Sequence, residues 1–479
     1  MSQSLPSPSV DFSEWYNDIV YRAELVSLSP VRGCPIIRPY AYEIWENLRT
    51  ALNTRFKATG HENAYFPLFI PKSYLEREAE HVEGFSPELA VVTIGGGKEL
   101  EEPYVVRPTS ETIIGEAMSN WIQSYRDLPL LLNQWANVVR WELRTRPFLR
   151  TTEFLWQEGH TAHANEAEAE AETLQMLDVY ADVVINEAAI PVIKGQKSES
   201  ERFAGALRTY TIEGMMGDKK ALQSGTSHNL GQNFAKAFNI QFLDENNTQQ
   251  TCWTTSWGFS TRVIGAIIMT HGDEKGLRLP PRLATYQIVI VPIYKTDEEK
   301  SVVLERAHAL KKELMSAGLR VKLDDRDGLT PGYKFNDWEM RGVPVRLELG
   351  PRDVQNGSVV AGRRDMPGKE GKQFFQMETV VTQVRELLDA IHYNMLDQAT
   401  KFRDANIFDV KNYDELKGVI EQGGFARGWW VEDAQLEAQI KAETGATHRC
   451  YPFDQPEGEG NCFMSGRKSN RVALFAKAY

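Results

Sequence analysis

The sequence predicts several domains of mixed α and β structure, and three observations lead to this fold class. The first is length, because 479 residues suffice for roughly three domains of about 150 residues each. The second is composition, because 42% apolar and 25% charged residues exclude a wholly disordered or low-complexity chain. The third is a strand–helix–strand pattern beyond residue 283, which predicts a smaller α/β domain after a larger N-terminal part.

Charge, cysteine content and hydropathy narrow the class further. Lys and Arg total 54 against 66 Asp and Glu, a net charge of −12, which excludes a generic polyanion binder. Binding to RNA depends on local charge, and basic residues outnumber acidic ones between Arg341 and Lys372 and from Arg467 onwards. Four cysteines are too few for a disulfide scaffold. With no secretory signal and no run of ~18 apolar residues, we expect a cytoplasmic protein without a membrane span.

The first part of the chain alternates predicted helices and strands. Apolar residues recur every four positions over residues 40–59, which predicts a helix that ends at Gly60. The segment 64–71 contains two prolines, which suit an edge strand. The other elements expected here are two strands joined by a glycine-rich turn over residues 91–106, and helices over residues 110–125 and 165–190.

The second half changes character after a glycine and two prolines at residues 276–282, which predict a linker. A buried-type strand, a helix closed by Gly318 and a second strand follow. The remainder forms a third unit that contains Cys450 and Cys462. The domains expected are therefore residues 1–282, 283–395 and 396–479.

Three clusters combine charged and polar residues at spacings that packing alone does not require. The first is Arg107-Pro-Thr109-Ser-Glu111, where a hydroxyl and a carboxylate could face one cavity and hold a small ammonium ligand. In the alternative interpretation, Ser110 caps a helix and Glu111 lies in its first turn.

The other two clusters are rich in arginine. In residues 138–163, two strand-like halves flank a loop, and Arg140 and Glu142 alternate with apolar neighbours, which predicts one strand face for both. They form either a plain ion pair or part of a site, and the arginines of the loop favour a multiply charged anion such as a nucleoside triphosphate. In residues 256–276, a polar turn leads to Arg262 at the start of an apolar helix, where it can meet an anion.

Together these clusters resemble the three motifs of class II aminoacyl-tRNA synthetases: a long helix with a strand ending at Pro67, Arg140-x-Glu142, and Gly-Phe-Ser-Thr-Arg262. Further segments are similar to prolyl-tRNA synthetases of the archaeal/eukaryotic-type branch with a C-terminal extension: residues 107–111, Gln157-Glu-Gly-His160-Thr and Gln223-Ser-Gly-Thr-Ser-His228. The resemblance covers about residues 12–479. It implies an α+β catalytic domain with an antiparallel sheet, an α/β anticodon-binding domain, a small α/β C-terminal domain, and a homodimer built around motif 1.

The resemblance also implies roles for individual residues. Thr109, Glu111, Arg140 and His228 would bind proline, with the Glu111 carboxylate pairing with the cationic ring nitrogen. Arg140 would bridge the proline carboxylate and the α-phosphate of ATP, and Arg140 and Arg262 would be catalytic because they stabilise the charge that builds there.

For the nucleotide, Glu142 would accept from the adenine amino group, and Phe154 and Arg262 would sandwich the ring. Arg150 and Thr151 would belong to the loop that contacts ATP. The residues implied for ATP binding are Arg140, Glu142, Arg150, Thr151, Phe154, Gln223, Thr226, Ser260 and Arg262.

The implied activity is ATP-dependent ligation of L-proline to tRNA(Pro) through a prolyl-adenylate, in protein biosynthesis. Mg²⁺ would bridge the phosphates, and positioning plus electrostatics would replace a covalent nucleophile. Residues 197–206 match a loop that in relatives orders when proline binds, a lid. Glu339 and Arg346 would contact anticodon bases.

Two features of the family are expected to be absent. Relatives often hold zinc with four C-terminal cysteines, but this chain has Gly428 and Asp433 near the first pair of positions, and Cys462 and Ser465 at the second. Two thiols do not make a closed tetrahedral site, so we expect neither zinc nor another protein-held metal. Residues 164–251 leave no room for the editing domain of bacterial-type relatives, so we expect some activation of alanine.

The same residues disfavour two other functions. A catalytically silent synthetase paralogue would usually lack motif arginines, and none is missing here. A threonyl- or glycyl-specific synthetase is disfavoured by the set Thr109, Glu111 and His228.

Overall fold

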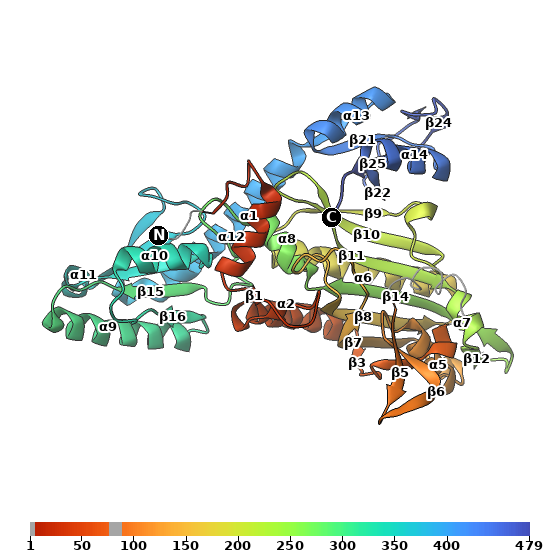
Figure 1. Cartoon of the computed structure of the whole chain (residues 1–479), viewed down its shortest axis with the longest axis horizontal. Helices are drawn as coiled ribbons and strands as arrows, with labels where there is room; N and C mark the ends of the chain where they lie inside the picture. Colours follow the sequence, from red (N-terminus) through yellow and green to blue (C-terminus); the bar gives the residue numbers. More distant parts are fainter. Residues whose placement is uncertain (1–4, 76–88) are drawn as a thin grey trace.

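Figure 1 shows the computed structural model, which describes residues 5–75 and 89–479. A large sheet with its helices lies on the right of that view, a smaller α/β part on the left, and the C-terminal helices and strands above the sheet. No helix among the described residues is long and apolar enough to cross a membrane.

The central element is a sheet that has eleven strands in the described part of the chain. From β21 to β7 every neighbouring pair is antiparallel, which confirms the expected class II sheet. In spatial order the strands are β20 (Ile407–Asp409), β21 (Phe425–Trp429), β25 (Val472–Ala476), β22 (Thr447–Pro452), β9 (Val192–Gln196), β10 (Arg208–Met215), β11 (Ala221–Gly231), β14 (Trp253–Ser260), β8 (Glu153–His163), β7 (Leu130–Val139) and β3 (Glu62–Asn63).

The C-terminal part is continuous with this sheet rather than a separate unit beside it. Its strand β22 pairs with β9 through Tyr451 opposite Gln196 and Pro452 opposite Gly195. The boundary predicted at residue 395 lies inside α12 (Val380–Asp404), a helix that leads from one part into the next. The remaining C-terminal elements are α13 (Tyr413–Gln422), α14 (Ala434–Thr444), β23 (Gly460–Asn461) and β24 (Lys468–Ser469).

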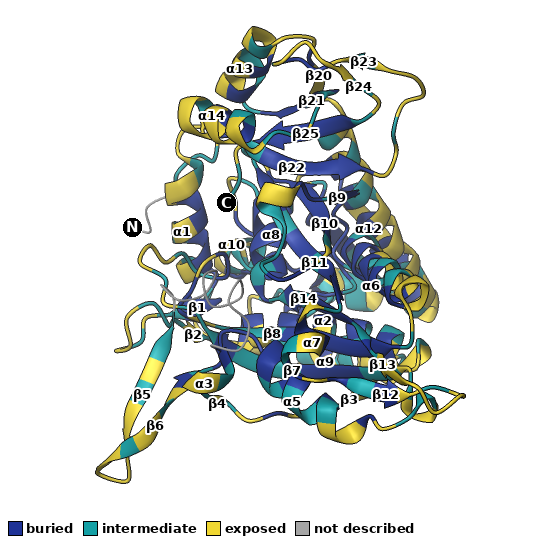
Figure 2. Ribbon diagram, turned by 90° about the vertical axis from the view of Figure 1, so that its right-hand side faces the viewer, coloured by how far each residue is buried: buried dark blue, intermediate teal, exposed yellow. Residues whose placement is uncertain are grey.

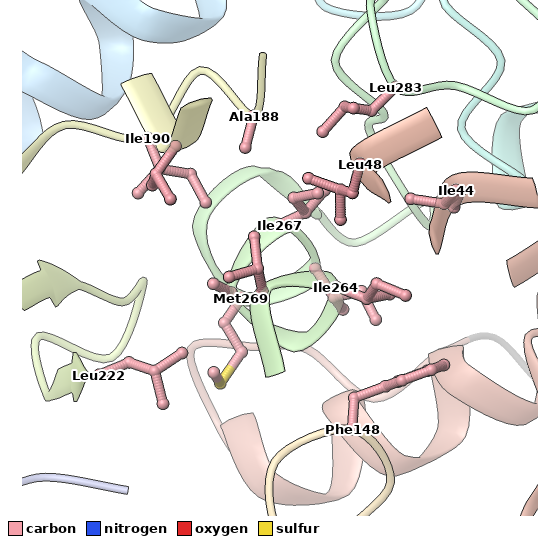
Figure 3. Close-up of a cluster of buried hydrophobic side chains, with 14 of the residues drawn as sticks. Ile44, Leu48, Phe148, Ala188, Ile190, Leu222, Ile264, Ile267, Met269 and Leu283 are labelled. Atoms are coloured by element: carbon pink, nitrogen blue, oxygen red, sulfur yellow. The ribbon is translucent and has the colours of Figure 1, made fainter. Parts of the chain in front are cut away.

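Three helices bury the main apolar core against the sheet: α2 (Pro39–Ala58), α6 (Glu166–Asn186) and α8 (Arg262–His271). α2 begins at Pro39, whose missing N–H costs nothing in a first helical turn, and it buries the residues whose four-residue spacing predicted the helix. Figure 3 shows buried side chains of α8, of which Ile264, Ile267 and Met269 are labelled, surrounded by buried side chains from distant segments. The labelled residues from those segments are Ile44, Leu48, Phe148, Ala188, Ile190, Leu222 and Leu283.

A second, smaller sheet of three strands extends from the N-terminal half and carries exposed residues in Figure 2. Among the described residues β4 (Phe69–Pro71) is an edge strand of that sheet, paired with β6 (Lys98–Val106), so Pro71 lies in an edge strand as predicted, whereas Pro67 precedes the strand. β5 (Ala90–Gly95) is joined to β6 through Gly96 and Gly97, which both adopt positive φ and form the predicted turn. Elements around this sheet and the core are α1 (Phe12–Arg22), β1 (Val26–Ser27), β2 (Ile36–Ile37), α3 (Lys72–Leu75), α5 (Glu111–Trp121), η2 (Tyr125–Asp127), η3 (Glu199–Glu201), α7 (Asn233–Ala237), β12 (Gln241–Leu243) and β13 (Gln249–Thr251).

The smaller α/β part contains a five-stranded sheet in the order β16-β15-β17-β18-β19. β15 pairs in parallel with both β16 and β17, so the predicted strand–helix–strand unit is confirmed. Its elements are β15 (Ile288–Pro292), α9 (Asp297–Ser316), β16 (Val321–Leu323), α10 (Pro331–Met340), β17 (Val345–Leu349), α11 (Pro351–Gln355), β18 (Ser358–Arg363), β19 (Lys372–Gln376) and η4 (Met377–Thr379).

Candidate active site

A cavity of about 280 Å³ lies on the sheet face opposite the α6 core. Four alternate residues of β8 line it, because successive strand residues point to opposite faces. Gly258 on the neighbouring strand β14 belongs to the same lining, and a Cβ there would lie 3.2 Å from the Trp156 ring. The β8 residues are Phe154, Trp156, Glu158 and His160.

One end of this cavity is acidic. The Thr109 hydroxyl donates to Glu111 Oε2 over 2.5 Å, and both residues are buried. Glu158 is also buried and accepts from the Ser110 amide (3.0 Å) and hydroxyl (2.6 Å). The alternative interpretation is confirmed in position, because Ser110 is the N-cap residue of α5 and Glu111 lies in its first turn. The Ser110 side chain makes no cap hydrogen bond, however, because its hydroxyl donates to Glu158. Buried carboxylates at this end favour a small cationic ligand.

Two histidines at this end have opposite pKa shifts. Burial disfavours charge on His160, but the Glu158 carboxylate 2.9 Å away and the charge of Glu111 outweigh it and raise the pKa of His160. Burial lowers the pKa of His228 to about 4, so its ring is neutral at neutral pH. His228 Nδ1 is hydrogen-bonded to Thr209 Oγ1 (3.0 Å), and the Phe203 ring stacks on it at 4.5 Å.

The other end of the cavity is basic and opens toward a second cavity of about 190 Å³. Arg140 and Arg262 line both cavities. Arg140 Nε donates to the Pro108 carbonyl (3.0 Å), and Arg262 Nε to the Leu149 carbonyl (3.3 Å). Burial and the charges of Arg150 and Arg140 lower the pKa of Arg262 to about 10. Cations held this close together favour a multiply charged anion at the junction.

The loop between β7 and β8 forms the wall of the second cavity. Glu142 Oε2 lies 3.6 Å from an Arg150 nitrogen, and its other oxygen accepts from the Arg144 amide. The Thr151 hydroxyl donates to the Glu153 carbonyl (2.7 Å). Arg140 and Glu142 follow the end of β7 rather than lying in the strand, so the prediction of one strand face for both is wrong. The polar turn predicted before Arg262 is the end of strand β14.

Every proline- or ATP-site residue predicted from the sequence lines one of these two cavities. The first holds Thr109, Glu111, Gln223, Thr226 and His228, the second holds Glu142, Arg150 and Thr151, and both share Arg140, Phe154, Ser260 and Arg262.

Sequence reasoning missed several residues of the first cavity. One of these is Trp156, which strand alternation starting at Phe154 would have placed on the cavity face. Trp156 Nε1, Ser224 Oγ and Ser256 Oγ line the cavity and have no hydrogen-bond partner in the part of the chain that the structure describes. Buried polar atoms are normally hydrogen-bonded, so these three are available to a ligand or to water.

The two residues predicted for anticodon contact lie together in the smaller α/β part. Arg346 on β17 approaches Glu339 on α10 with 3.8 Å between nitrogen and oxygen. The Arg346 guanidinium also donates to Glu348 (2.9 Å) and lies 4.0 Å from the centre of the Phe335 ring. Both side chains are partly exposed.

Two of the four C-terminal positions considered for zinc, Asp433 and Ser465, contact a cation of the chain itself. Arg467 donates to Asp433 Oδ2 (2.8 Å) and to Ser465 Oγ (3.3 Å). Cys462 and Cys450 are buried in different apolar clusters. The described residues contain no group of three His, Cys, Asp or Glu that could hold a metal, and a guanidinium already pairs with the carboxylate, so these residues do not fit a zinc ion.

Comparisons with known proteins cover all three parts of the chain. The model for "tRNA synthetase class II core domain (G, H, P, S and T)" matches residues 92–271, "Anticodon binding domain" matches residues 287–387, and "Prolyl-tRNA synthetase, C-terminal" matches residues 413–479. Similar relatives include the chloroplastic/mitochondrial proline–tRNA ligase of Arabidopsis thaliana, 59% identical over 98% of this chain and 87% of the relative. Proline–tRNA ligases of Roseiflexus sp. (strain RS-1) and Chloroflexus aurantiacus are 57% and 58% identical over 98% of each chain.

Proposed function

The chain belongs to the prolyl-tRNA synthetases, and from this membership we propose how its two cavities divide the reaction. The enzyme ligates proline to tRNA at the expense of ATP. The observation that carries the proposal is the pair of partly buried arginines, Arg140 and Arg262, at the junction between an acidic cavity and a basic one.

The first cavity binds proline. At neutral pH the proline ring nitrogen is cationic and pairs with Glu111, whose carboxylate the Thr109 hydroxyl orients. Neutral His228, with Phe203 stacked on it, supplies an apolar wall for the ring. The proline carboxylate then points toward Arg140 at the junction.

ATP occupies the second cavity and the junction. Phe154 and Arg262 flank the adenine, and Glu142 accepts from its amino group. Arg150 and Thr151 on the loop, with Gln223, Thr226 and Ser260 at the junction side, complete the nucleotide site. Mg²⁺ enters with the substrate as MgATP, since this ion usually binds through phosphates and waters rather than an all-protein cage.

In the first step a proline carboxylate oxygen attacks the α-phosphorus of ATP, forming prolyl-adenylate and displacing pyrophosphate. Negative charge builds on the α-phosphate oxygens, and Arg140 and Arg262 stabilise it there. Their guanidinium groups are held in advance by the Pro108 and Leu149 carbonyls, so little reorganisation accompanies the reaction. In the second step a terminal tRNA hydroxyl attacks the prolyl carbonyl and AMP leaves.

The anticodon of tRNA(Pro) contacts Glu339 and Arg346 in this proposal. A guanidinium and a carboxylate side by side complement guanine and cytosine edges. The enzyme acts as a homodimer through motif 1, formed by α2 and the segment to Pro67. Exposed aromatic side chains at Tyr65 and Phe69, beside that segment, support such an interface, and sedimentation would measure it.

Three properties complete the proposal. The chain holds no zinc, and metal analysis of purified protein would contradict this by finding one tightly held zinc per chain. It activates some alanine, because a pocket built for proline rejects a smaller apolar substrate only modestly. Residues 164–251 form α6 to β13 and hold no inserted domain that could hydrolyse the wrong product. Undetectable alanine-dependent exchange at saturating alanine would contradict the activation of alanine. It acts in the cytoplasm, which cell fractionation would test.

Amino-acid-dependent exchange of pyrophosphate into ATP tests the function directly. Proline should support rapid exchange, alanine weak exchange, and threonine or glycine none. Equal rates with threonine or glycine would refute the assignment of the first cavity, and no exchange with any amino acid would refute the activity.

A further inference from the structure

The segment of residues 197–206 borders the first cavity through Glu201 and Phe203. Two residues of this segment are hydrogen-bonded to Thr209 of the catalytic sheet. At the start of the segment the Lys197 amide donates to the Thr209 carbonyl (2.9 Å). Six residues later the Phe203 amide donates to the Thr209 hydroxyl (3.0 Å), which is also hydrogen-bonded to His228. The placement of this segment therefore affects the cavity wall directly.

The middle of the segment is held from the C-terminal part of the chain, more than 230 residues away in sequence. Ser198 Oγ donates to Glu437 Oε2 over 2.8 Å, and Ser200 Oγ donates to the same oxygen. The Glu199 amide donates to Glu432 Oε1 over 2.5 Å. Three successive residues of the segment thus bind two carboxylates of the C-terminal part, Glu432 just before α14 and Glu437 in its first turn.

The C-terminal part also fixes the position of these carboxylates. Asp433, between them, caps α14 by accepting from the Gln435 and Leu436 amides, and Arg467 pairs with its other oxygen. Glu437 lies in the first turn of that helix, and its second oxygen accepts from Trp430 Nε1 (3.4 Å). Glu437 is only 7% exposed, so it depends on these donors for its hydrogen bonds.

We propose that Glu437, assisted by Glu432, is a positioning residue for amino-acid binding: the C-terminal part holds the 197–206 segment against the first cavity and so sets its affinity for proline. This inference rests on the proposed assignment of that cavity to proline. In the alternative the contacts only stabilise the fold, and the two interpretations differ in which kinetic constant changes.

Three variants separate them. Glu437→Ala removes the acceptor from the C-terminal side, and the double variant Ser198→Ala/Ser200→Ala removes the donors from the segment without altering α14. Glu443→Ala is the matched control, because Glu443 is an exposed glutamate of the same helix that accepts from Tyr413 and Gln439 and makes no contact with the 197–206 segment among the described residues.

Pyrophosphate exchange should show a KM for proline raised roughly 10- to 100-fold in Glu437→Ala and in the double serine variant, the range for lost hydrogen bonds to a charged group. The KM for ATP and kcat should stay within about twofold of the parent, and Glu443→Ala should match the parent. Combining Glu437→Ala with the serine substitutions should add little, since both remove one contact.

Trypsin supplies a readout that needs no activity, because it cuts after Arg202. Cleavage there should be faster in Glu437→Ala than in Glu443→Ala, and saturating proline should slow it. The proposal would be overturned by an unchanged KM for proline in Glu437→Ala, or by an equal rise in the KM for proline and the KM for ATP. Fully additive effects of Glu437→Ala and of the double serine variant would also overturn it. Wild-type protein inactive with proline would instead refute the assigned function, so the two failures are distinguishable.

Discussion

Glu213 on β10 is the centre of a buried charge cluster that joins the catalytic sheet to the C-terminal part. Its carboxylate is fully buried and accepts from Lys197 (3.0 Å), Thr211 (2.9 Å) and Arg449 (2.9 Å). Burial raises its pKa, but the two cations outweigh this, and the pKa of Glu213 is lowered from its ordinary value. Replacing it with glutamine keeps the shape and leaves two buried cations without a counter-charge.

Removing one partner of a buried ion pair costs about 3–5 kcal/mol. A loss of 1 kcal/mol lowers the melting temperature by roughly 2–4 °C in a cooperative unit of about 150–250 residues. Glu213→Gln should therefore lower the melting temperature by about 6–20 °C. Differential scanning calorimetry measures this. The control is Asp178→Asn, which breaks an exposed pair with Lys194 and should lower the melting temperature by no more than about 4 °C. Equal shifts in the two variants would refute the reasoning.

Three further predictions concern the sites. Glu111→Gln should raise the KM for proline about 10- to 100-fold with the KM for ATP unchanged, because it removes the counter-charge of the ring nitrogen; equal changes in both constants in an exchange assay would contradict this. Arg346→Ala should slow charging of tRNA(Pro) at least about tenfold while leaving pyrophosphate exchange intact, and an equal loss of exchange would place Arg346 elsewhere in function. Burial lowers the pKa of His271 to about 3, so only the unfolded chain binds a proton between about pH 6.5 and 3, and stability falls as pH falls through that range. Between pH 7 and pH 5 the free energy of unfolding of His271→Gln should fall by about 2 kcal/mol less than that of the parent. Melting curves at each pH measure this, and an equal fall in the two proteins would contradict the lowered pKa of His271.

Local patterns in the sequence were enough to predict the elements and most of the site. Three predictions rest on residues close together in sequence, and the structure confirms them. They are the helix α2 from its four-residue spacing, the edge strand β4 from Pro71, and the turn before β6 from its glycines. The cavity lining from Phe154 to His160 follows from strand alternation alone.

Long-range contacts were beyond this kind of reasoning. Nothing local at Ser110 shows that its hydroxyl donates to Glu158, 48 residues later. Likewise, nothing in the C-terminal segment shows that β22 pairs with β9 or that Glu437 binds Ser198. Such pairings depend on which surfaces meet after folding, and a single sequence carries no direct record of them.

The central claim is that Arg140 connects the proline and ATP cavities and stabilises the charge that develops between them. Proline-dependent pyrophosphate exchange by Arg140→Ala and by the parent tests it most directly, with the melting temperature of both proteins measured as a control for folding. Exchange should fall to background while the melting temperature stays within a few degrees. Near-normal exchange by Arg140→Ala would contradict the account.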